Sequence, residues 1–250
     1  MTTERIRIRA FRSAIDREST VRYVVGHARV LENIGVYLAL GMDYSWCTDP
    51  RSVVVVAEHA YFGVVGGVRL DIARPGSPLA MERLLFSMDP AIRASLSLLE
   101  PLGNAEICGL WNSDHMAGRG IPSLLTAAAL SIAPTLGLHS VVSLSASYST
   151  KYLANCGFEF MTNLGREGSF EFPIPGIHSN AMLNTDLCGL IKARPDQRQR
   201  ILSLRTAPAQ WRTESPKGRS LEVEYALMEA IDADQPIYRW LAEERLRQSA

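Results

Sequence analysis

The chain begins with a strand pattern that gives way to a helix pattern. Residues 5–11 alternate arginine with apolar side chains, which is the period of a β-strand with one solvated face, and the row of arginines suits the edge of a sheet. From Asp16 the apolar positions repeat at helical spacing, and Gly35 stands where such a helix would stop. We expect this helix to bury one stripe against the sheet, formed by Val21, Val24, Ala28 and Leu31.

The next apolar segments predict neighbouring strands and then an excursion from the sheet. Residues 52–70 contain two β-rich runs, SVVVVAEHAYF and VVGGVRL, which indicate adjacent antiparallel strands. Turn residues follow over 71–78, and a helix is expected from about Pro90 to Leu99.

The centre of the chain predicts a β-loop-α-β unit. A short apolar strand over 104–112 leads into an alanine- and leucine-rich helix over 121–137, and a second strand follows over 139–146. Such a unit places its two strands parallel, with a right-handed crossover. A short helix and three more strands are then expected to complete the sheet, at 149–156, 158–161, 169–172 and 178–186.

The composition shifts after residue 190. A charged helix, a linker and two terminal helices are expected, at 194–205, 206–220, 221–231 and 237–248. We therefore predict an α/β domain over 1–190 and a C-terminal helical extension over 191–250. The two terminal helices carry enough apolar surface to need a cover, either the main domain or a second subunit of a homodimer.

Charge and composition narrow the function. The 250 residues are 47% apolar and 21% charged, as in an ordinary soluble globule, and 26 basic side chains balance 26 acidic ones. Without an excess of positive charge, the chain lacks the electrostatic footprint of a nucleic-acid-binding or membrane-surface protein. No apolar run approaches the ~18 residues of a membrane span and the N-terminus is too charged for a signal peptide, so we expect a cytoplasmic protein. The four cysteines are too widely spaced for a zinc site or a disulfide framework, so buried free thiols and no metal are expected.

The loop before the central helix is a candidate anion site. It reads AGRGIP over 117–122. Gly118 and Gly120 allow a tight turn, after which the first N–H groups of the helix point outward unpaired. Together with the positive end of the helix dipole, and with Arg119 as a charged donor, this terminus suits an anion. The alternative is a turn that only starts the helix, with Pro122 in its favoured first turn.

Two motifs resemble the GNAT acyltransferase superfamily. The segment AEICGLWNSDHMAGRGIPSLL over 105–125 is similar to the central motif of that family, and KYLANCGFEF over 151–160 is similar to its next motif. The resemblance covers about residues 50–188 and implies a mixed, twisted α/β sheet with a central parallel βαβ unit flanked by helices. Ala117 and Pro122 depart from the family's loop, and Pro122 lacks an N–H, which implies a weaker grip on a pyrophosphate.

The resemblance implies direct attack of an amine on an acyl thioester held by its phosphopantetheine arm. The arm would pair with open backbone groups of the first strand, as a peptide adds to a sheet edge, while the loop would bind phosphate. The donor-binding residues so implied are Leu110, Trp111, Asn112, Gly118, Arg119, Gly120, Ile121 and Ser123.

Two residues are candidates for proton transfer. Glu106 lies in a short apolar strand beside the implied thioester site, where burial would raise its pKa and suit it as the base for a protonated amine. A solvated or salt-bridged carboxylate is the alternative. Tyr152, in the second motif, is the candidate proton donor to the departing thiolate, or else a packed aromatic residue. Asp114 and His115 can take these roles, or act only as turn residues.

Two further segments are similar to the branch of the superfamily that makes N-acyl amino acids and acyl-homoserine lactones. They are GGVRL at 66–70 and FPIPGIHSNAML at 172–183. That branch takes its acyl group from an acyl carrier protein. The two resemblances together therefore imply either acyl-CoA or an acylated carrier protein as the donor. Arg69 can bind a carboxylate of a small amine acceptor through its planar guanidinium, or end a strand in solvent. We expect an acyl-CoA-dependent N-acyltransferase; the alternatives are a carrier-dependent N-acyl amino acid synthase and a non-catalytic binding module.

Overall fold

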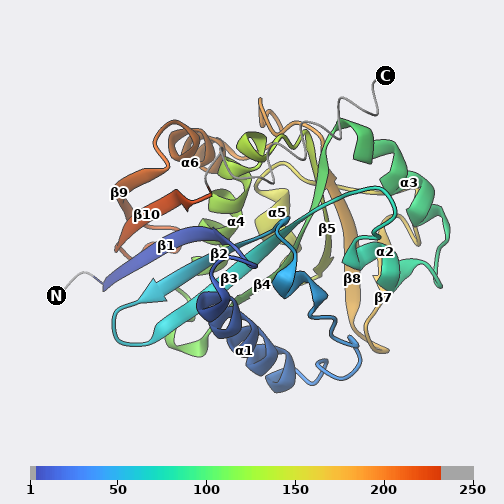
Figure 1. Ribbon diagram of the computed structural model, residues 1–250, viewed down its shortest axis with the longest axis horizontal. Helices are drawn as coiled ribbons and strands as arrows, with labels where there is room; N and C mark the ends of the chain where they lie inside the picture. The colour runs from blue at the N-terminus through green and yellow to red at the C-terminus, as the bar shows by residue number, and fades with distance from the viewer. Residues whose placement is uncertain (1–3, 232–250) are drawn as a thin grey trace.

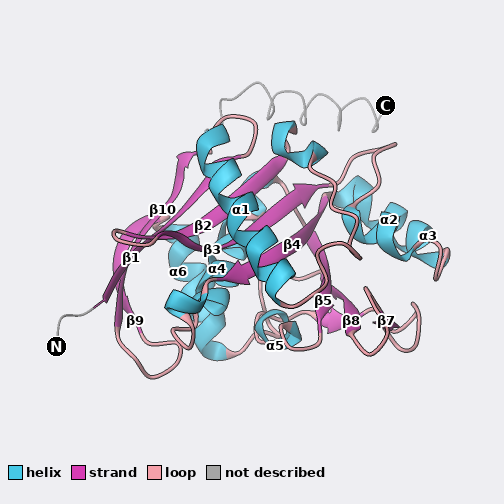
Figure 2. Ribbon diagram, turned by 90° about the horizontal axis from the view of Figure 1, so that it is seen from below, coloured by secondary structure: helices cyan, strands magenta, loops and turns pink. Residues whose placement is uncertain are grey.

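A computed structural model describes residues 4–231, which form one sheet with helices on both faces (Figures 1 and 2). The strands are β1 (Glu4–Arg12), β2 (Ser52–His59), β3 (Gly63–Ile72), β4 (Asn104–Asn112), β5 (Ser140–Ala146), β6 (Glu159–Phe160), β7 (Ser169–Glu171), β8 (His178–Asn184), β9 (Ala209–Glu214) and β10 (Leu221–Ala230). The helices are α1 (Arg17–Asn33), α2 (Ala80–Leu85), α3 (Ala91–Leu99), α4 (Ile121–Ile132), α5 (Thr150–Ala154) and α6 (Pro195–Thr206).

The sheet is mixed, as the sequence predicts. Over the described residues its order is β6-β8-β5-β4-β3-β2-β1-β10-β9, and β7 pairs with β8. The strands β2 and β3 are antiparallel neighbours. The central strands β4 and β5 are parallel and joined through α4, which confirms the predicted βαβ unit at the middle of an α/β fold.

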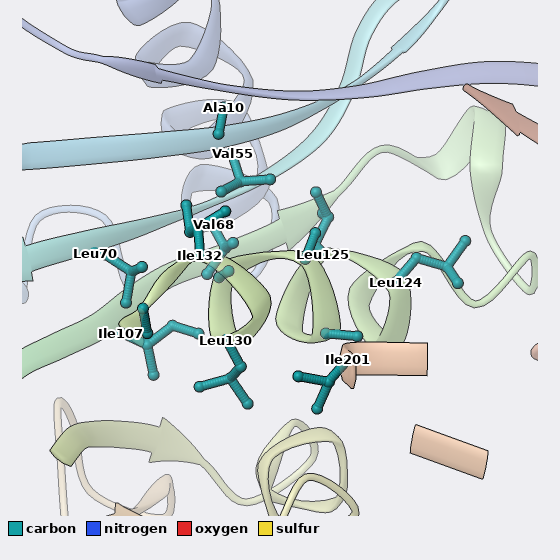
Figure 3. Close-up of a cluster of buried hydrophobic side chains, with 14 of the residues drawn as sticks. Ala10, Val55, Val68, Leu70, Ile107, Leu124, Leu125, Leu130, Ile132 and Ile201 are labelled. Carbon is teal, nitrogen blue, oxygen red and sulfur yellow. The ribbon is translucent and has the colours of Figure 1, made fainter. Parts of the chain in front are cut away.

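The core lies on both faces of the central strands. Helix α1 packs on one face, while α4 packs on the other with α6 beside it (Figures 1 and 2). Figure 3 shows where side chains of the strands meet those of α4 and α6. The strand residues labelled are Ala10, Val55, Val68, Leu70 and Ile107, and the helix residues are Leu124, Leu125, Leu130, Ile132 and Ile201. On the α1 side, Val54 and Val56 of β2 pack with Tyr23 and Trp111. Because both faces of β2 are covered, that strand reads as a continuous apolar run.

Helix α1 is where the sequence predicts it, but a different stripe faces the sheet. Asp16 caps the helix by accepting a hydrogen bond from the Ser19 N–H at 3.0 Å. The side chains of Tyr23 and Leu31 are buried, whereas Val21 is 60% exposed. The predicted stripe is therefore wrong at Val21. The side chain of Tyr23 points toward the sheet, and its hydroxyl donates to the carbonyl of Gly109 in β4. No local sequence pattern predicts this contact.

A glycine lets α1 lie close to β4. A Cβ atom on Gly26 would lie 2.0 Å from Cη2 of Trp111. We expect Gly26→Ala to destabilise the protein by about 1–3 kcal/mol through overpacking, even though alanine is the better helix former by about 1 kcal/mol. Urea unfolding of this variant beside Arg29→Ala, a change at an exposed position of the same helix, measures the difference. Equal stabilities would show that the indole moves aside without cost.

Strand β1 lies inside the sheet rather than at its edge, which corrects the expectation drawn from its arginines. It pairs with β2 on one side and with β10 on the other. Two of its arginines are paired with acids on these neighbours: Arg9 with Glu58 at 3.0 Å and Arg7 with Glu224 at 3.5 Å. These two positive charges are thus balanced across strands.

The predicted helix over 221–231 is wrong. Residues 221–230 form β10, which joins the main sheet beside β1, and part of the predicted linker forms β9. Leucine, glutamate, alanine and methionine favour a helix, but the order Leu-Glu-Val-Glu-Tyr over 221–225 has the period of a strand, and its apolar residues are buried in the main core. The charged helix over 194–205 is confirmed as α6. The predicted helix over 237–248 lies outside the described residues. It is the second of the two terminal helices expected to pack on the main domain or on a second subunit.

Candidate active site

The central strands part soon after they meet. Parallel pairing of β4 with β5 is confined to three registers, from Asn104–Ser140 to Glu106–Val142. Directly beyond this point the Ser143 hydroxyl donates to the Ile107 carbonyl at 2.8 Å, in place of a backbone ladder. A cavity of about 510 Å³ opens here, lined by residues 106–110 of β4 and 143–146 of β5. A crevice between these strands is what the resemblance implies for a thioester arm.

The carboxyl of Glu106 stands on the wall of this cavity. The residue is 2% exposed, and its Oε2 accepts a hydrogen bond from the Met81 N–H of α2 at 2.9 Å. Burial raises the pKa of Glu106 to about 7, and the nearby Asp71 carboxylate adds to the rise. The group is therefore close to half ionised near neutral pH, which is the range in which a general base works best.

Arg69 lines the same cavity from β3. Its guanidinium lies over the Trp46 ring, 4.0 Å from the centroid, and its Nε and Nη2 each lie 2.8 Å from Oδ2 of Asp71. The Cys108 thiol donates to the same oxygen at 3.6 Å. Among the described residues, no hydrogen bond from Nη1 of Arg69 is found. Arg69 therefore sits in a fixed orientation at the cavity wall.

A β-bulge distorts β4 next to this wall. Gly67 of β3 pairs with Trp111 and Arg69 pairs with Cys108, so β4 carries one extra residue between them. Gly109 takes a φ of 60° there, and its carbonyl accepts a hydrogen bond from the Tyr23 hydroxyl at 2.7 Å. Because carbonyl and N–H point in opposite directions across a trans peptide, the Leu110 N–H is directed away from Tyr23.

Helix α1 brings a histidine to the same place, one turn after Tyr23. His27 lines the cavity, and its Cε1 atom is 3.5 Å from the position that a Cβ would take on Gly109. Burial, followed by the positive charge of Arg69, lowers the pKa of His27 to about 4. Sequence reasoning missed Tyr23, His27 and Gly109 as site residues. The available signal was a glycine inside an apolar strand, which marks a bulge.

The implied donor-binding strand contributes less than expected. Leu110 lines the cavity. Trp111 instead packs into the α1 side of the core, 4% exposed. Asn112 pairs with Gly66 of β3, and its Nδ2 donates to the Ser113 carbonyl. The bulge is the reason, because beyond it β4 returns to regular pairing with β3.

The loop before α4 has the predicted backbone but lies outside the cavity lining. Gly118 and Gly120 have φ angles of 73° and 77°, and Gly120 is the N-cap of α4. Arg119 forms an ion pair with Glu4. The other predicted residues of this loop have protein contacts of their own: Ile121 is buried and the Ser123 hydroxyl donates to Gln197 at 3.3 Å. The anion site stays a prediction.

A hairpin that sequence reasoning missed lies against this loop. A Cβ on Gly120 would lie 2.6 Å from Cγ of Pro216 and 3.3 Å from Cγ of Lys217. Both residues belong to the turn between β9 and β10. The hairpin therefore covers one side of the loop and brings a lysine close to the start of α4.

The tyrosine that reaches the cavity is not the one predicted. Tyr148 lines it, beside Ser145 and Ser149, whose hydroxyls are 3.0 Å apart. Tyr152 lies outside the lining, with the Lys151 ammonium 5.3 Å from its ring centroid. Asp114 and His115 also lie outside it, in the short turn η3 (Asp114–Met116). The His115 ring stacks on Phe62 at 4.5 Å.

Over residues 4–231, no cluster of three or more His, Cys, Asp or Glu residues could hold a metal ion, and no helix is long and apolar enough to cross a membrane. All four cysteines are free. Cys156 is buried as expected, whereas Cys188 is exposed, which corrects the expectation of four buried thiols.

The sheet is mixed, and its two central parallel strands pair at three registers and then part. The chain has the fold of the GNAT acyltransferases, as a comparison with solved structures shows. MesI, a CoA-dependent acyl-homoserine lactone synthase, matches with a TM-score of 0.53 at 15% identity, over 81% of this chain and 97% of its own. BjaI, another such synthase, solved with SAM and isopentyl-CoA, matches with a TM-score of 0.52 at 15% identity, over 92% and 97%. FeeM, an N-acyl amino acid synthase from uncultured soil microbes, matches with a TM-score of 0.50 at 15% identity, over 73% and 93%.

No protein-family model matches the sequence, and no curated protein sequence matches it. The likeness to known proteins is therefore one of fold, and the chemistry of this chain rests on its own residues.

Proposed function

We propose that the protein is an N-acyltransferase that moves an acyl group from acyl-CoA to a primary amine by direct attack. The observation that carries the proposal is the buried Glu106 carboxyl beside the crevice where β4 parts from β5. The GNAT fold supports the same reaction class, because the structures that share it include CoA-dependent acyl-homoserine lactone synthases and an N-acyl amino acid synthase.

In the proposed reaction the pantetheine arm enters the crevice and its thioester carbon comes to lie near Cys108 and Gly109. The amine nitrogen forms a bond to that carbon and the carbon–sulfur bond breaks. Glu106 takes the proton of the amine, directly or through one water. The departing thiolate takes a proton from Tyr148, which replaces Tyr152 in this role because it lines the cavity. Most of the acceleration then comes from positioning.

The acceptor is proposed to carry a carboxylate. Arg69 lines the cavity, and Asp71 holds Nε and Nη2 of its guanidinium, so Nη1 is the nitrogen proposed to bind the acceptor. An amine held between Glu106 and this nitrogen has the layout of an amino acid or a close relative. This supports a product of the N-acyl amino acid class, and Arg69 would act on binding rather than on chemistry.

The acyl group is proposed to be larger than acetyl. One wall of the cavity is apolar and comes from α1 and the loop after it, through Leu31, Ile34, Val36, Leu40 and Met42. An apolar wall of this kind gains free energy from each CH₂ group that it covers. The proposed donor is acyl-CoA. An acylated carrier protein presents the same phosphopantetheine arm and is the alternative to be tested.

Thermal unfolding tests the donor class. Octanoyl-CoA at 100 times its Kd is expected to stabilise the protein by about 2.7 kcal/mol, which raises Tm by about 5–10 °C for a chain of this size. Ser145→Trp fills the crevice and is expected to abolish that gain, whereas Ser147→Trp, at an exposed position two residues on, is expected to keep it. A gain from octanoyl carrier protein alone would select the carrier-dependent alternative. No gain from either thioester would contradict the proposal.

A further inference from the structure

The cavity holds one imidazole that the proposed chemistry does not use. Tyr23 and His27 stand four residues apart on α1, so they lie on one face of the helix. Both face the bulge of β4 at Gly109. Tyr23 is fully buried and its hydroxyl donates to the Gly109 carbonyl, while His27 lines the cavity.

Within the part of the chain that the structure describes, the two ring nitrogens of His27 have no hydrogen-bond partner. Over residues 4–231, no hydrogen bond or ion pair joins the imidazole to another group; its aromatic neighbour is Tyr23, with ring centroids 5.9 Å apart. The side chain is nevertheless only partly exposed. A polar group in such a place costs stability unless something fills its hydrogen-bonding capacity. Because His27 lines the cavity, a molecule bound there can form hydrogen bonds with these nitrogens.

The surroundings keep this imidazole neutral. Burial disfavours the charged form of the imidazole, and the positive charge of Arg69 on β3 disfavours it further. Its neighbours include the Gly109 backbone and the Tyr23 ring, and the Cys108 thiol lines the same cavity. Burial raises the pKa of both the Cys108 thiol and the Tyr23 hydroxyl, so these groups are uncharged at neutral pH. A neutral imidazole has one N–H donor and one acceptor nitrogen. It is suited to donate a hydrogen bond and poorly suited to take up a proton.

Resting on the proposed function, we propose that His27 is a catalytic residue that donates a hydrogen bond to the carbonyl oxygen of the acyl thioester. As the amine nitrogen bonds to the carbonyl carbon, the carbonyl electron pair moves onto the oxygen, and the imidazole N–H stabilises the resulting oxyanion. The pair returns when the carbon–sulfur bond breaks, so His27 ends the cycle with the proton it began with. A neutral histidine held this way polarises a carbonyl without exchanging a proton.

The geometry places donor and base on the same face of the sheet. Ala105 and Ile107 of β4 pack in the core that contains α4. The alternate side chains, Glu106 and Cys108, therefore leave β4 on the opposite face, on which α1 and His27 lie. Glu106 and Gly109 are three residues apart, about 10 Å along a strand. This spacing fits an acceptor amine near Glu106 and a thioester carbonyl near His27, with the reacting carbon between them.

The test compares variants that keep or remove the hydrogen bond. His27→Phe keeps a ring of similar size without a polar atom, and His27→Asn keeps a neutral N–H donor. The assay supplies octanoyl-CoA with a mixture of the twenty L-amino acids and measures free CoA and the acylated product by mass spectrometry. We expect His27→Phe to lower kcat about 100-fold with KM for octanoyl-CoA changed less than threefold, and His27→Asn to retain at least a tenth of wild-type kcat. His59→Phe, on the β2–β3 hairpin outside the cavity lining, is the matched control and is expected to keep wild-type kcat.

Two further measurements keep the proposal falsifiable. Added imidazole is expected to restore kcat of His27→Ala at least tenfold, which a packing role would not produce. The acidic limb of the pH–kcat profile reports the ionisation of Glu106, so its midpoint is expected to be the same in wild type and in every His27 variant. The proposal is overturned if His27→Phe keeps wild-type kcat, or if its loss is matched by His27→Asn and not rescued by imidazole. A wild-type protein that releases no CoA and forms no product would instead overturn the proposed function.

Discussion

Glu106→Gln is expected to abolish acyl transfer and, at pH 8, to make the protein more stable. Glutamine keeps the acceptor oxygen for the Met81 N–H, so the local structure is retained. It cannot take a proton from the amine, and loss of a general base lowers kcat by about 10²- to 10⁴-fold. It also removes a carboxylate that is 2% exposed and costly to ionise there.

The direction of the stability change follows from the raised pKa. Folding moves the pKa of Glu106 from 4.5 to about 7, chiefly through burial. Below pH 4.5 the group is protonated in both states. Between these values the folded protein holds a proton that the unfolded chain has released, so stability falls as pH rises and then levels off above about 7. The shift corresponds to about 3 kcal/mol. Glutamine does not titrate, so the variant does not lose this stability between pH 4.5 and about 7.

Thermal unfolding of wild type and Glu106→Gln at pH 4 and pH 8 measures this effect. We expect similar Tm values at pH 4 and a higher Tm for the variant at pH 8. Glu159→Gln is the control, because Glu159 is exposed and pairs with Lys192 on the surface; it should leave both Tm values and kcat nearly unchanged. A Glu106→Gln variant that is less stable than wild type at pH 8 would show that the surroundings stabilise the carboxylate, and burial would then not be the dominant influence on its pKa.

The part of the site that could be predicted from sequence is the part carried by one local unit. The strand with Glu106, the loop and the α4 helix follow one another along the chain, so their periods and turn residues reveal them together. The burial of Glu106 follows from its apolar neighbours in that strand. These are contacts between elements that the chain itself joins.

What could not be predicted depends on elements brought together from a distance. Tyr23 reaches Gly109 across 86 positions of sequence, and nothing near Tyr23 signals that its hydroxyl has a partner. The same holds for β10, whose residues favour a helix but pair with β1 in the folded sheet, more than 200 positions away in the sequence. Tertiary pairing overrides local preference in both cases. The roles proposed for Glu106 and Arg69 remain predictions.

Gly109→Ala is expected to damage both stability and catalysis, because the bulge needs a residue without a side chain. A φ of 60° costs an L-residue about 1–2 kcal/mol. The new Cβ would also lie 2.2 Å from the Tyr23 hydroxyl oxygen, so the bond that anchors the bulge must break, at a further cost of about 1 kcal/mol. We expect a loss of about 3 kcal/mol, and kcat lowered about 100-fold as the carbonyl site beside His27 shifts.

A second glycine separates backbone strain from the contact. Gly76 has a φ of 74°, and a Cβ there would meet nothing within 4 Å. Gly76→Ala should therefore lose only about 1–2 kcal/mol to backbone strain and keep its activity. Urea unfolding and kcat of the two variants, measured side by side, give the test. If both lose the same stability and both remain active, then Tyr23 does not hold the bulge in its working shape, and the crevice between β4 and β5 must be kept open by the parting of the strands alone.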